Sequence, residues 1–185
     1  MTRLVAVEDR FVGARTTLRL VTLADCARHY VAWLADPEVN RYLETRWATQ
    51  DLASIRAFVS AMLASPDSYL FAILENGGGR HVGNIKIGPI HPRHAYADVS
   101  YFIGERAYWG AGLATDAIRL ATRVAFERLG LHRVQAGLYE GNVGSARVIE
   151  KAGYRFEGRQ RRKLAGPGGW EDHVWYGLVR EDWTP

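Results

Sequence analysis

Residues 105–117 form the stretch ERAYWGAGLATDA, which decides the fold because two glycines separate a strand from a helix. The segment YADVSYFI at residues 96–103 predicts the strand, and apolar residues at helical spacing predict a long helix over residues 113–129. The first N–H groups of a helix lack partners inside it, and the helix dipole adds positive charge there. Gly110 and Gly112 let a ligand approach the backbone closely. The stretch therefore predicts an anion site suited to a pyrophosphate.

Two glycines before a helix are often only a turn, so other phosphate-binding motifs have to be compared. The chain has no Gly-Lys-Ser/Thr sequence, which disfavours a P-loop. The third glycine of a dinucleotide fingerprint would fall at Thr115, and the chain does not begin with a strand-helix-strand unit. A Rossmann domain is therefore disfavoured as well.

The elements before this stretch follow from periodicity and from turn residues. We expect a strand at residues 17–23, then a helix that Thr22 or Asp25 caps and that ends near Ala35. Thr49 is expected to cap a second helix at residues 51–64, and residues 69–75 and 81–90 are expected to form a hairpin.

The elements after it are shorter. We expect a strand at residues 132–138, a helix at 145–152 and two strands at 154–163 and 171–179, joined by a turn at 165–169. The whole order predicts an α/β (α+β) fold: one domain over residues 1–185, with a mixed central sheet of about seven strands flanked by about four helices.

Composition places the chain among ordinary globular proteins. Of its 185 residues, 48% are hydrophobic and 24% are charged, which excludes wholesale disorder. The single Cys26 excludes an internal disulfide and a cysteine-rich zinc site, and it favours a cytoplasmic location. Glu8, Asp9 and Arg10 interrupt the start, so no secretory signal is expected. No apolar run reaches about 18 residues, so no membrane partner is expected.

The net charge of +4 comes almost entirely from arginine. A basic surface suits nucleic acid, or an anionic small molecule such as a phosphorylated cofactor, or it only keeps the protein soluble. The nucleic-acid interpretation depends on the pI of about 9.4 and on the run RQRRK at residues 159–163, which an exposed terminal strand explains more simply. We therefore expect no nucleic-acid partner.

A second informative stretch, YEGNVGSARVIEKAGY, covers residues 139–154. Asn142 lies where a strand is expected to end, and Ser145 opens the next helix. Both are typical helix-capping residues. They also provide two polar side chains beside whatever the upstream glycine turn holds.

Taken together, these stretches resemble the GNAT superfamily of acetyl-CoA-dependent N-acetyltransferases, and more narrowly its ribosomal-protein alanine N-acetyltransferase branch. The resemblance covers about residues 16–183. It depends on Trp109-Gly110-x-Gly112-x-Ala114-Thr115-Asp116-Ala117, on Asn142-x-x-Ser145, on Glu150-Lys151-x-Gly153-Tyr154, and on Leu18-Arg19-Leu20 with Asp25, Trp33 and Asp36-Pro37.

The resemblance implies that acetyl-CoA lies in a cleft between the strands at residues 96–103 and 132–138. The pantetheine would pair with the backbone, and the pyrophosphate would contact N–H groups of the glycine turn. Arg106, Arg147 or Lys151 would reach the CoA phosphates. The implied cofactor-binding residues are Phe102, Ile103, Trp109, Gly110, Ala111, Gly112, Leu113, Ala114, Thr115, Asn142, Ser145 and Arg147.

Two positions depart from the family pattern. The phosphate motif of the family commonly begins with Gln or Arg three residues before the first glycine, where this chain has Ala107. Many members carry a tyrosine acid seven residues after the asparagine, where this chain has Ile149. The resemblance therefore implies that Ser145 replaces that tyrosine as the proton donor to the leaving thiolate.

An amine attacks a thioester only after it has lost its extra proton, so a base is expected. The resemblance implies Asp98 as the base, because relatives often place an acidic residue at this position of the strand, and Asp98 completes a predicted catalytic set with Ser145 and Asn142. An acid in an otherwise apolar strand is equally consistent with an aspartate that faces an edge or forms a salt bridge. His91, His94 and Glu44 are competitors from loops. His91 and His94 lack a third ligand, so no metal is expected. Ser145 lacks the flanking glycines of a nucleophile elbow, which disfavours a serine hydrolase.

The acceptor of the acetyl group stays open. Residues 83–90 (GNIKIGPI) are similar to a segment of GNAT enzymes that acetylate nucleotide-linked amino sugars. Trp33, Tyr42, Trp47 and Trp170 lie in segments that line the acceptor side in relatives. We predict a small amine or amino sugar as acceptor. The alternatives are a protein N-terminal α-amine and, from another class, a non-catalytic acyl-CoA-binding module. The resemblance also leaves a homodimer open.

Overall fold

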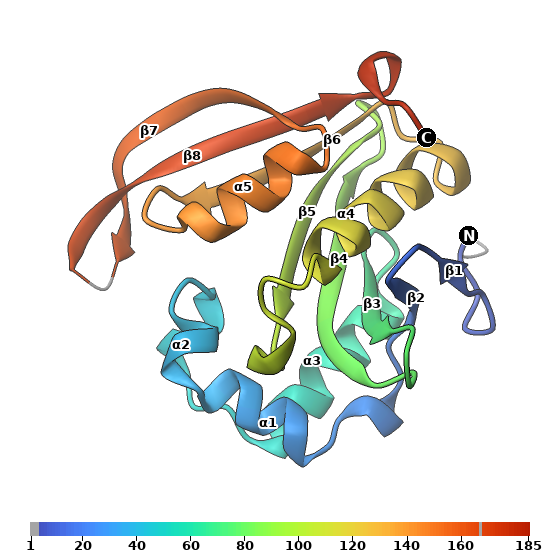
Figure 1. Ribbon diagram of the computed structural model, residues 1–185, viewed down its shortest axis with the longest axis vertical. Coiled ribbons are helices and arrows are strands. Elements are labelled where there is room, and N and C mark those ends of the chain that lie inside the picture. Colours follow the sequence, from blue (N-terminus) through green and yellow to red (C-terminus); the bar gives the residue numbers. More distant parts are fainter. Residues whose placement is uncertain (1–3, 167) are drawn as a thin grey trace.

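The computed structural model describes residues 4–166 and 168–185, whose strands form one eight-stranded mixed sheet (Figure 1). The strand order is β1-β2-β3-β4-β5-β6-β8-β7. Neighbours are antiparallel except β5 and β6, which are parallel. The strands are β1 (Phe11–Val12), β2 (Thr16–Leu20), β3 (Tyr69–Glu75), β4 (His81–His91), β5 (Tyr96–Ile103), β6 (Arg133–Tyr139), β7 (Arg155–Gly166) and β8 (Gly169–Val179).

Helices cover both faces of this sheet, which confirms the α/β prediction. On one face, Trp33 and Val59 pack with Ala72 of β3. On the other face, Ala117 and Ile118 are fully buried against the sheet. The first face holds α1 (Arg28–Ala35), α2 (Pro37–Asn40) and α3 (Leu52–Ala64), and the second holds α4 (Leu113–Arg123) and α5 (Val143–Lys151). No helix of the described residues is long and apolar enough to cross a membrane.

The side chains of β5 alternate between these two faces, as its sequence predicts. Val99 and Ile103 belong to the core under α4, whereas Phe102 packs near Tyr30 and Trp33 under α1. A strand with period-two alternation places neighbouring residues on opposite faces. Tyr101 therefore faces α4 and α5, and Asp98 faces the opposite side.

The sheet divides at its parallel pair. The β5–β6 register consists of Tyr96↔Arg133, Ala97↔Val134 and Asp98↔Gln135. Within the described chain no further rung joins the two strands, although residues 99–103 continue to pair with β4 and residues 136–139 with β8. The carboxyl-terminal halves of β5 and β6 therefore each have one unpaired edge, and we call the space between them the split.

The last two strands form a long hairpin that extends beyond α5 (Figure 1). The predicted strand at 154–163 runs from Arg155 to Gly166, and its partner begins at Gly169, so both strands are longer than the sequence suggested. Within the turn predicted at residues 165–169, Pro167 lies outside the described residues. The β7–β8 register shifts twice, between Phe156 and Gly158 and between Gln160 and Leu164. β7 forms one outer edge of the sheet.

Several predicted boundaries were wrong, each for a local reason. The helix expected from Thr22 to Ala35 divides into a 3-10 turn at Leu23–Asp25 and α1, because Ala27 is extended between them. Asp51, not Thr49, caps α3, and its carboxylate accepts the Ser54 N–H at 2.7 Å. The helix predicted to reach Leu129 is α-helical only to Arg123 and continues as a π-helical turn at Val124–Arg128.

Two short elements had no sequence prediction. The strand β1 has two residues, too few for a periodic pattern. The helix α2 has four residues and begins at Pro37, after Asp36, whose side chain accepts the Glu38 N–H at 2.9 Å. The Asp-Pro pair was interpreted only as the end of α1, although proline is also favoured in the first turn of a helix.

Candidate functional site

The N-terminus of α4 is open toward solvent, as the glycine pattern predicts. Gly110 and Gly112 have φ of 75° and 81°, in the left-handed region that favours glycine. Gly112 is the N-cap and provides no side-chain hydrogen bond. The first helical bond runs from the Asp116 N–H to the Gly112 carbonyl oxygen. The N–H groups of residues 113–115 therefore lack acceptors within the helix and suit an anion.

The loop before α4 is tied to the end of β5. The indole of Trp109 donates to the Ile103 carbonyl oxygen at 2.8 Å. The N–H groups of Gly104 and Glu105 both donate to the carbonyl oxygen of Val82. Trp33 packs so closely on Gly104 that a β-carbon there would collide with its ring. These contacts fix the glycine turn beside the split.

Asn142 and Ser145 lie at the N-terminus of α5, which begins at Val143 rather than at the predicted Ser145. The Asn142 side chain is the N-cap and accepts the Ser145 N–H at 3.2 Å. The hydroxyl of Tyr101 on β5 donates to the Ser145 hydroxyl oxygen at 3.0 Å. Because this bond uses a Ser145 lone pair, the Ser145 proton remains available for another acceptor. Burial raises the pKa of Tyr101 to about 12, so its hydroxyl stays protonated at neutral pH.

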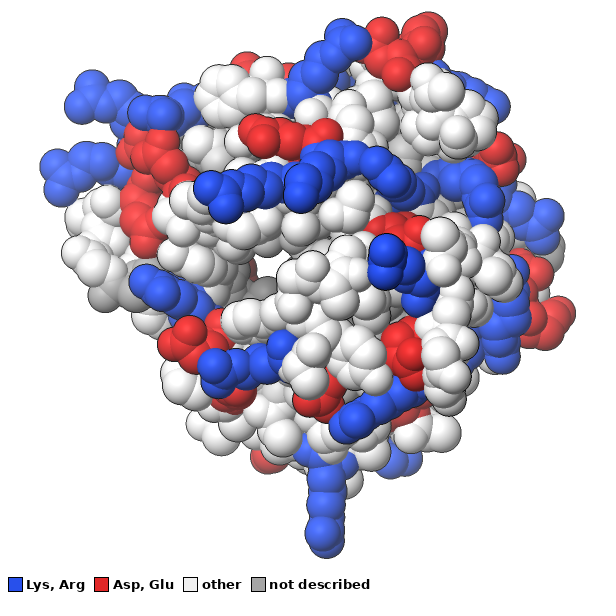
Figure 2. Space-filling model, viewed as in Figure 1, with Lys and Arg blue, Asp and Glu red and all other residues white. Residues whose placement is uncertain are grey.

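The sequence analysis missed Tyr101. The family pattern has a tyrosine seven residues after the asparagine, but here the hydroxyl comes from β5, 44 residues before Ser145. The alternation of β5 was the available signal, because it places Tyr101 on the α4 and α5 face. Figure 2 shows the surface hollowed between the part that holds α5 and the part that holds α1 and α2, with basic side chains over α4 and α5.

Asp98 lies at the last rung before the split, on the face opposite Tyr101. Its Oδ1 accepts a hydrogen bond from Gln135 Nε2 at 2.8 Å. The same face of the next strands holds Tyr139 of β6 and His173 of β8, which pair directly with each other. The structure thus adds His173, which the sequence analysis did not consider, to the set of titratable groups near Asp98.

The segment Glu44–Trp47 is a 3-10 turn that reaches this face from the other side of the split. Tyr139 donates its hydroxyl to the Glu44 carboxylate. Arg46 donates to the Tyr139 hydroxyl at 2.9 Å and to the Ala165 carbonyl oxygen at 2.6 Å. Glu44 is exposed, so it adds negative charge to the rim without being buried itself.

Three groups named from the sequence lie elsewhere. Trp33 is only 5% exposed and packs in the core, so it does not offer a stacking surface, unlike Trp47 and Trp170, which are each 62% exposed. His91 and His94 stack on each other at the turn after β4, with ring centroids 4.4 Å apart. No group of three or more potential metal ligands occurs in the part of the chain that the structure describes.

The arginines and lysine proposed for CoA phosphates have different surroundings. Arg106 lies 3.5 Å from Asp36 and over the ring of Trp109. Arg147 is exposed at the first turns of α5. Lys151 lies at the far end of α5, where its carbonyl oxygen accepts Arg119. Of the three, Arg147 therefore lies on the same first turns of α5 as Ser145.

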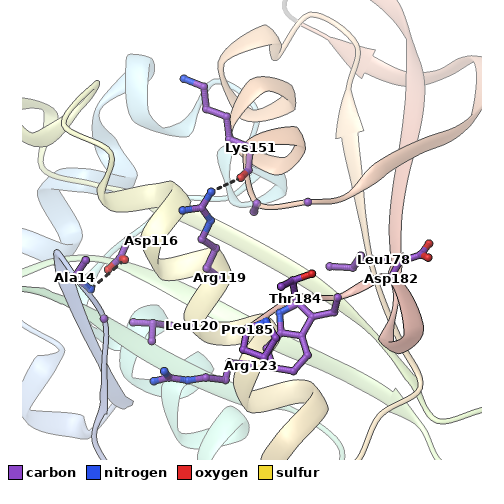
Figure 3. Close-up of a pocket in the computed structure, with 14 residues that line it drawn as sticks. Ala14, Asp116, Arg119, Leu120, Arg123, Lys151, Leu178, Asp182, Thr184 and Pro185 are labelled. Carbon is purple, nitrogen blue, oxygen red and sulfur yellow. Dashed lines mark hydrogen bonds between the residues drawn. The ribbon is translucent and has the colours of Figure 1, made fainter.

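A cavity of about 560 Å³ lies apart from the split, along the outer side of α4 (Figure 3). Arg119 and Arg123 line it with the C-terminal residues 182–185. Asp116 closes one end and accepts the N–H groups of Ala14, Arg15 and Thr16. Because Asp116 anchors the β1–β2 loop to α4, its occurrence in the motif has a structural explanation.

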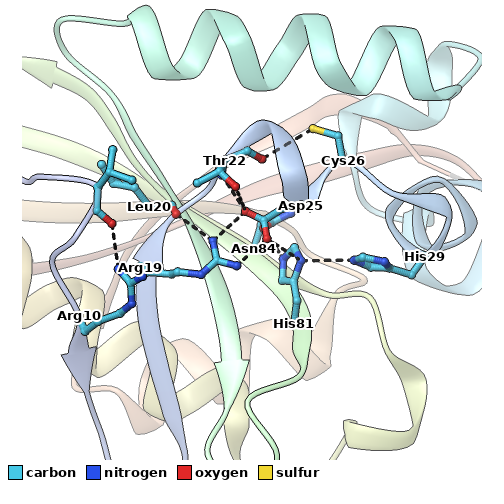
Figure 4. Close-up of polar contacts among 10 residues, drawn as sticks. Arg10, Arg19, Leu20, Thr22, Asp25, Cys26, His29, His81 and Asn84 are labelled. Carbon is cyan, nitrogen blue, oxygen red and sulfur yellow. Dashed lines mark hydrogen bonds and ion pairs between the residues drawn. The ribbon is translucent and has the colours of Figure 1, made fainter.

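A buried polar cluster lies beside α1, at the 3-10 turn that precedes it (Figure 4). Arg19 donates two hydrogen bonds to Asp25, at 2.7 and 2.5 Å. Burial alone would raise the pKa of Asp25, but hydrogen bonds from Arg19 and Thr22 lower it to about 2. His81 lies 4.0 Å from Asp25 and contacts Asn84 Oδ1 at 2.9 Å. This cluster joins β2, β4 and the 3-10 turn before α1, which is a structural role.

Comparison with known proteins gives a consistent result. The model of the acetyltransferase (GNAT) domain matches residues 15–155. "Probable N-acetyltransferase YjcK" of Bacillus subtilis is 36% identical over 121 residues, which are 65% of this chain and 66% of that protein. The "[Ribosomal protein uS5]-alanine N-acetyltransferase" of Escherichia coli is 30% identical over 108 residues, 58% of this chain and 53% of that enzyme.

Solved structures show the same fold. The structure of Mycobacterium smegmatis RimJ in complex with CoA-disulfide has a TM-score of 0.83 at 23% identity. The match covers 96% of this chain and 90% of that one. The eight-stranded sheet with helices on both faces is therefore an arrangement that known proteins share.

Proposed function

The chain belongs to the GNAT acetyltransferase family, and from this premise we propose that it transfers the acetyl group of acetyl-CoA directly to a primary amine. The observation that carries the proposal is the uncapped N-terminus of α4 beside the split, with the Ser145–Tyr101 hydroxyl pair on the same face. The first feature suits a pyrophosphate and the second suits a leaving thiolate.

The unpaired strand edges explain how the rest of the cofactor would be held. The edge of β5 that faces the split offers backbone groups of alternate residues to the amides of a pantetheine arm. Of the two predicted residues, Ile103 lies at this edge and its carbonyl oxygen already accepts the Trp109 indole, whereas the Phe102 carbonyl oxygen faces Gly83 of β4.

Within the predicted stretch 109–115, the N–H groups of Trp109 and Ala111 donate to Arg106 and Tyr108, so the proposed pyrophosphate site consists of the N–H groups of residues 113–115. Arg147 is proposed to contact a phosphate. Leu113 contributes only its backbone, because its side chain is buried in the core.

The chemistry follows from the two faces of the split. The amine nitrogen attacks the thioester carbon from the Asp98 face, where the charges of Asp98 and Glu44 attract an ammonium group. Backbone N–H groups at the end of β5 stabilise the oxyanion. Ser145 donates its proton to the leaving thiolate while Tyr101 hydrogen-bonds the Ser145 oxygen, and Asn142 holds Ser145 at the helix start. No covalent enzyme intermediate is needed.

A small amine or a nucleotide-linked amino sugar is the acceptor that we propose first. The exposed rings of Trp47 and Trp170 offer stacking surfaces for a base or sugar. The second candidate is a protein N-terminal α-amine, favoured by the match to an enzyme named for the alanine of ribosomal protein uS5. The two candidates share the same attack on the thioester, so the acceptor has to be identified by assay.

The first test measures thermal unfolding with acetyl-CoA, ATP or NAD. A ligand at about 100 times its dissociation constant adds about 2.7 kcal/mol to the free energy of unfolding. We expect stabilisation by acetyl-CoA alone. A thiol-release assay then compares spermidine, a nucleotide-linked amino sugar and a short peptide that begins with alanine. Stabilisation without thiol release from any amine would identify a non-catalytic acyl-CoA-binding module, and no stabilisation would contradict the proposal.

A further inference from the structure

The imidazole of His173 lies over the β6 strand at the edge of the split. Gly137 is two residues past the last β5–β6 rung, on the face that also holds Asp98 and Tyr139. A β-carbon at Gly137 would collide with Nε2 of His173 and would lie 3.2 Å from the ring of Trp175. The absence of a side chain at Gly137 therefore leaves room for the imidazole ring.

The imidazole is also held on its other side. Its ring centroid lies 4.6 Å from that of Trp175, whose indole donates to Gln160 Oε1 at 3.3 Å. Nδ1 of His173 is buried and has no hydrogen-bond partner among the residues that the structure describes. A buried ring nitrogen without a partner is costly, so such a group in a native fold requires an explanation.

The charged groups around His173 come from three other elements. Lys163 of β7 disfavours the imidazolium, whereas Asp98 of β5 and Glu44 favour it. Burial is the largest effect, and together with Lys163 it lowers the pKa of His173 below its usual 6.5. The imidazole is therefore neutral at pH 7 and able to accept a proton.

We propose that His173 is the general base that removes the proton from the acceptor ammonium group. This inference rests on the proposed function. The imidazole takes one proton from R–NH₃⁺, and the freed lone pair forms the C–N bond to the thioester carbon. The C–S bond then breaks, and the thiolate takes the Ser145 proton. The amine nitrogen then loses its second proton, which solvent carries to the Ser145 oxygen. His173 releases its own proton to solvent.

The other candidate bases on this face each accept one hydrogen bond. Asp98 accepts the Gln135 side chain, and Glu44 accepts the Tyr139 hydroxyl. His91 and His94 lie at the turn between β4 and β5, away from the end where β5 reaches Ile103. These contacts leave Asp98 and Glu44 to attract the ammonium group and His173 to accept its proton.

The test compares wild type, His173→Gln and, as matched control, His91→Gln. The probe is whichever of spermidine, the amino sugar and the alanine peptide the wild type acetylates fastest. For His173→Gln we expect kcat/KM at pH 7 to fall about 10²-fold, with unchanged stabilisation by acetyl-CoA. The fall in kcat/KM at acid pH that protonation of the imidazole causes should disappear. The pH dependence of the variant should then reflect only the fraction of the probe that is free amine. His91→Gln should keep the wild-type profile.

Two further measurements keep the test decisive. Free imidazole should restore part of the activity of His173→Gly, which a purely structural role would not allow. NMR titration of the wild-type imidazole should give a neutral ring at pH 7. An unchanged pH profile in a folded His173→Gln variant, or a charged ring at pH 7, overturns the role of His173 and leaves the proposed function intact. A wild type that acetylates no probe overturns both.

Discussion

At the scale of single residues, the Ser145–Tyr101 pair makes a kinetic prediction. Ser145→Ala removes the proposed proton donor, so we expect kcat to fall about 10²-fold while acetyl-CoA binding changes little. Tyr101→Phe keeps Ser145 but removes the bond that orients its hydroxyl, and a smaller loss is expected. Steady-state kinetics and calorimetric titration with acetyl-CoA measure the two effects separately.

A second buried tyrosine provides the control for that prediction. The Tyr154 hydroxyl forms a 2.9 Å hydrogen bond with Thr122 beneath α4, away from the split. Tyr154→Phe should reduce stability by about 1 kcal/mol and leave kcat unchanged. If Ser145→Ala weakened acetyl-CoA binding but left kcat unchanged, Ser145 would be a binding residue rather than the acid.

Asp25 makes a prediction about acid stability. Its side chain is 8% exposed, and its pKa in the fold is about 2 against an ordinary 3.8. The unfolded chain therefore binds this proton more readily. The stabilisation is complete above about pH 4 and is lost as the pH falls toward 2, by about 2 kcal/mol in total. Urea unfolding at several pH values should show this loss in wild type and in Asp182→Asn, but not in Asp25→Asn.

How much of the site the sequence predicts depends on how local the contacts are. The Asn142–Ser145 contact spans three residues, and the sequence predicts both as helix-capping residues, although it begins the helix at Ser145 rather than at Val143. Tyr101 and His173 reach the site from β5 and β8, and their positions depend on strand register rather than on neighbouring sequence. A single sequence shows which face a strand residue takes, but not which distant side chain lies opposite.

At the scale of secondary-structure elements, the start of α4 is the feature to test. Gly112→Trp places a large side chain where the pyrophosphate is proposed to bind, and we expect acetyl-CoA to lose its stabilising effect. Gly130 lies at the other end of the same helical region, is exposed, and has a similar φ of 66°. Gly130→Trp therefore carries a similar backbone strain and should keep the acetyl-CoA effect.

Other results for this pair of variants would contradict the assignment of the α4 N-terminus to the cofactor site. Equal stabilisation of both variants by acetyl-CoA would remove the α4 N-terminus from the cofactor site. Loss of stabilisation in both would indicate a general effect of strain on the helix. Circular dichroism of each variant, recorded first, shows whether the fold is intact.

The bounds of an element could be predicted where its apolar residues recur with a regular period. The sequence predicted β5 with its observed bounds, because YADVSYFI alternates between apolar faces and loops flank it on both sides. It did not predict that α4 changes to a π-helical turn at Val124, because the apolar spacing continues through Ala125 and Phe126. It also did not predict where β5 and β6 separate, since parallel pairing joins segments that a whole helix divides.

At the scale of the whole molecule, three rungs between β5 and β6 join the two parts of the sheet. A ligand between the free strand edges would pair with both parts. We therefore expect acetyl-CoA to slow amide hydrogen exchange in residues 99–103 and 109–115. β3 lies between β2 and β4, where Phe71 pairs with Leu20 on one side and Ile85 on the other, so its amide exchange should not change. If acetyl-CoA slowed amide exchange only in residues that line the cavity beside Arg119, the cofactor would bind at that cavity and not in the split.

The outer edge of the long hairpin has a consequence for how the protein behaves at high concentration. A twelve-residue edge strand is a template on which other chains can pair and aggregate. The middle of β7 carries four cations, Arg159, Arg161, Arg162 and Lys163, and its register breaks beside them, where Arg162 has a φ of 49°. Charge and a kinked backbone both discourage a second chain from adding to the sheet, so these residues act as gatekeepers against fibril growth.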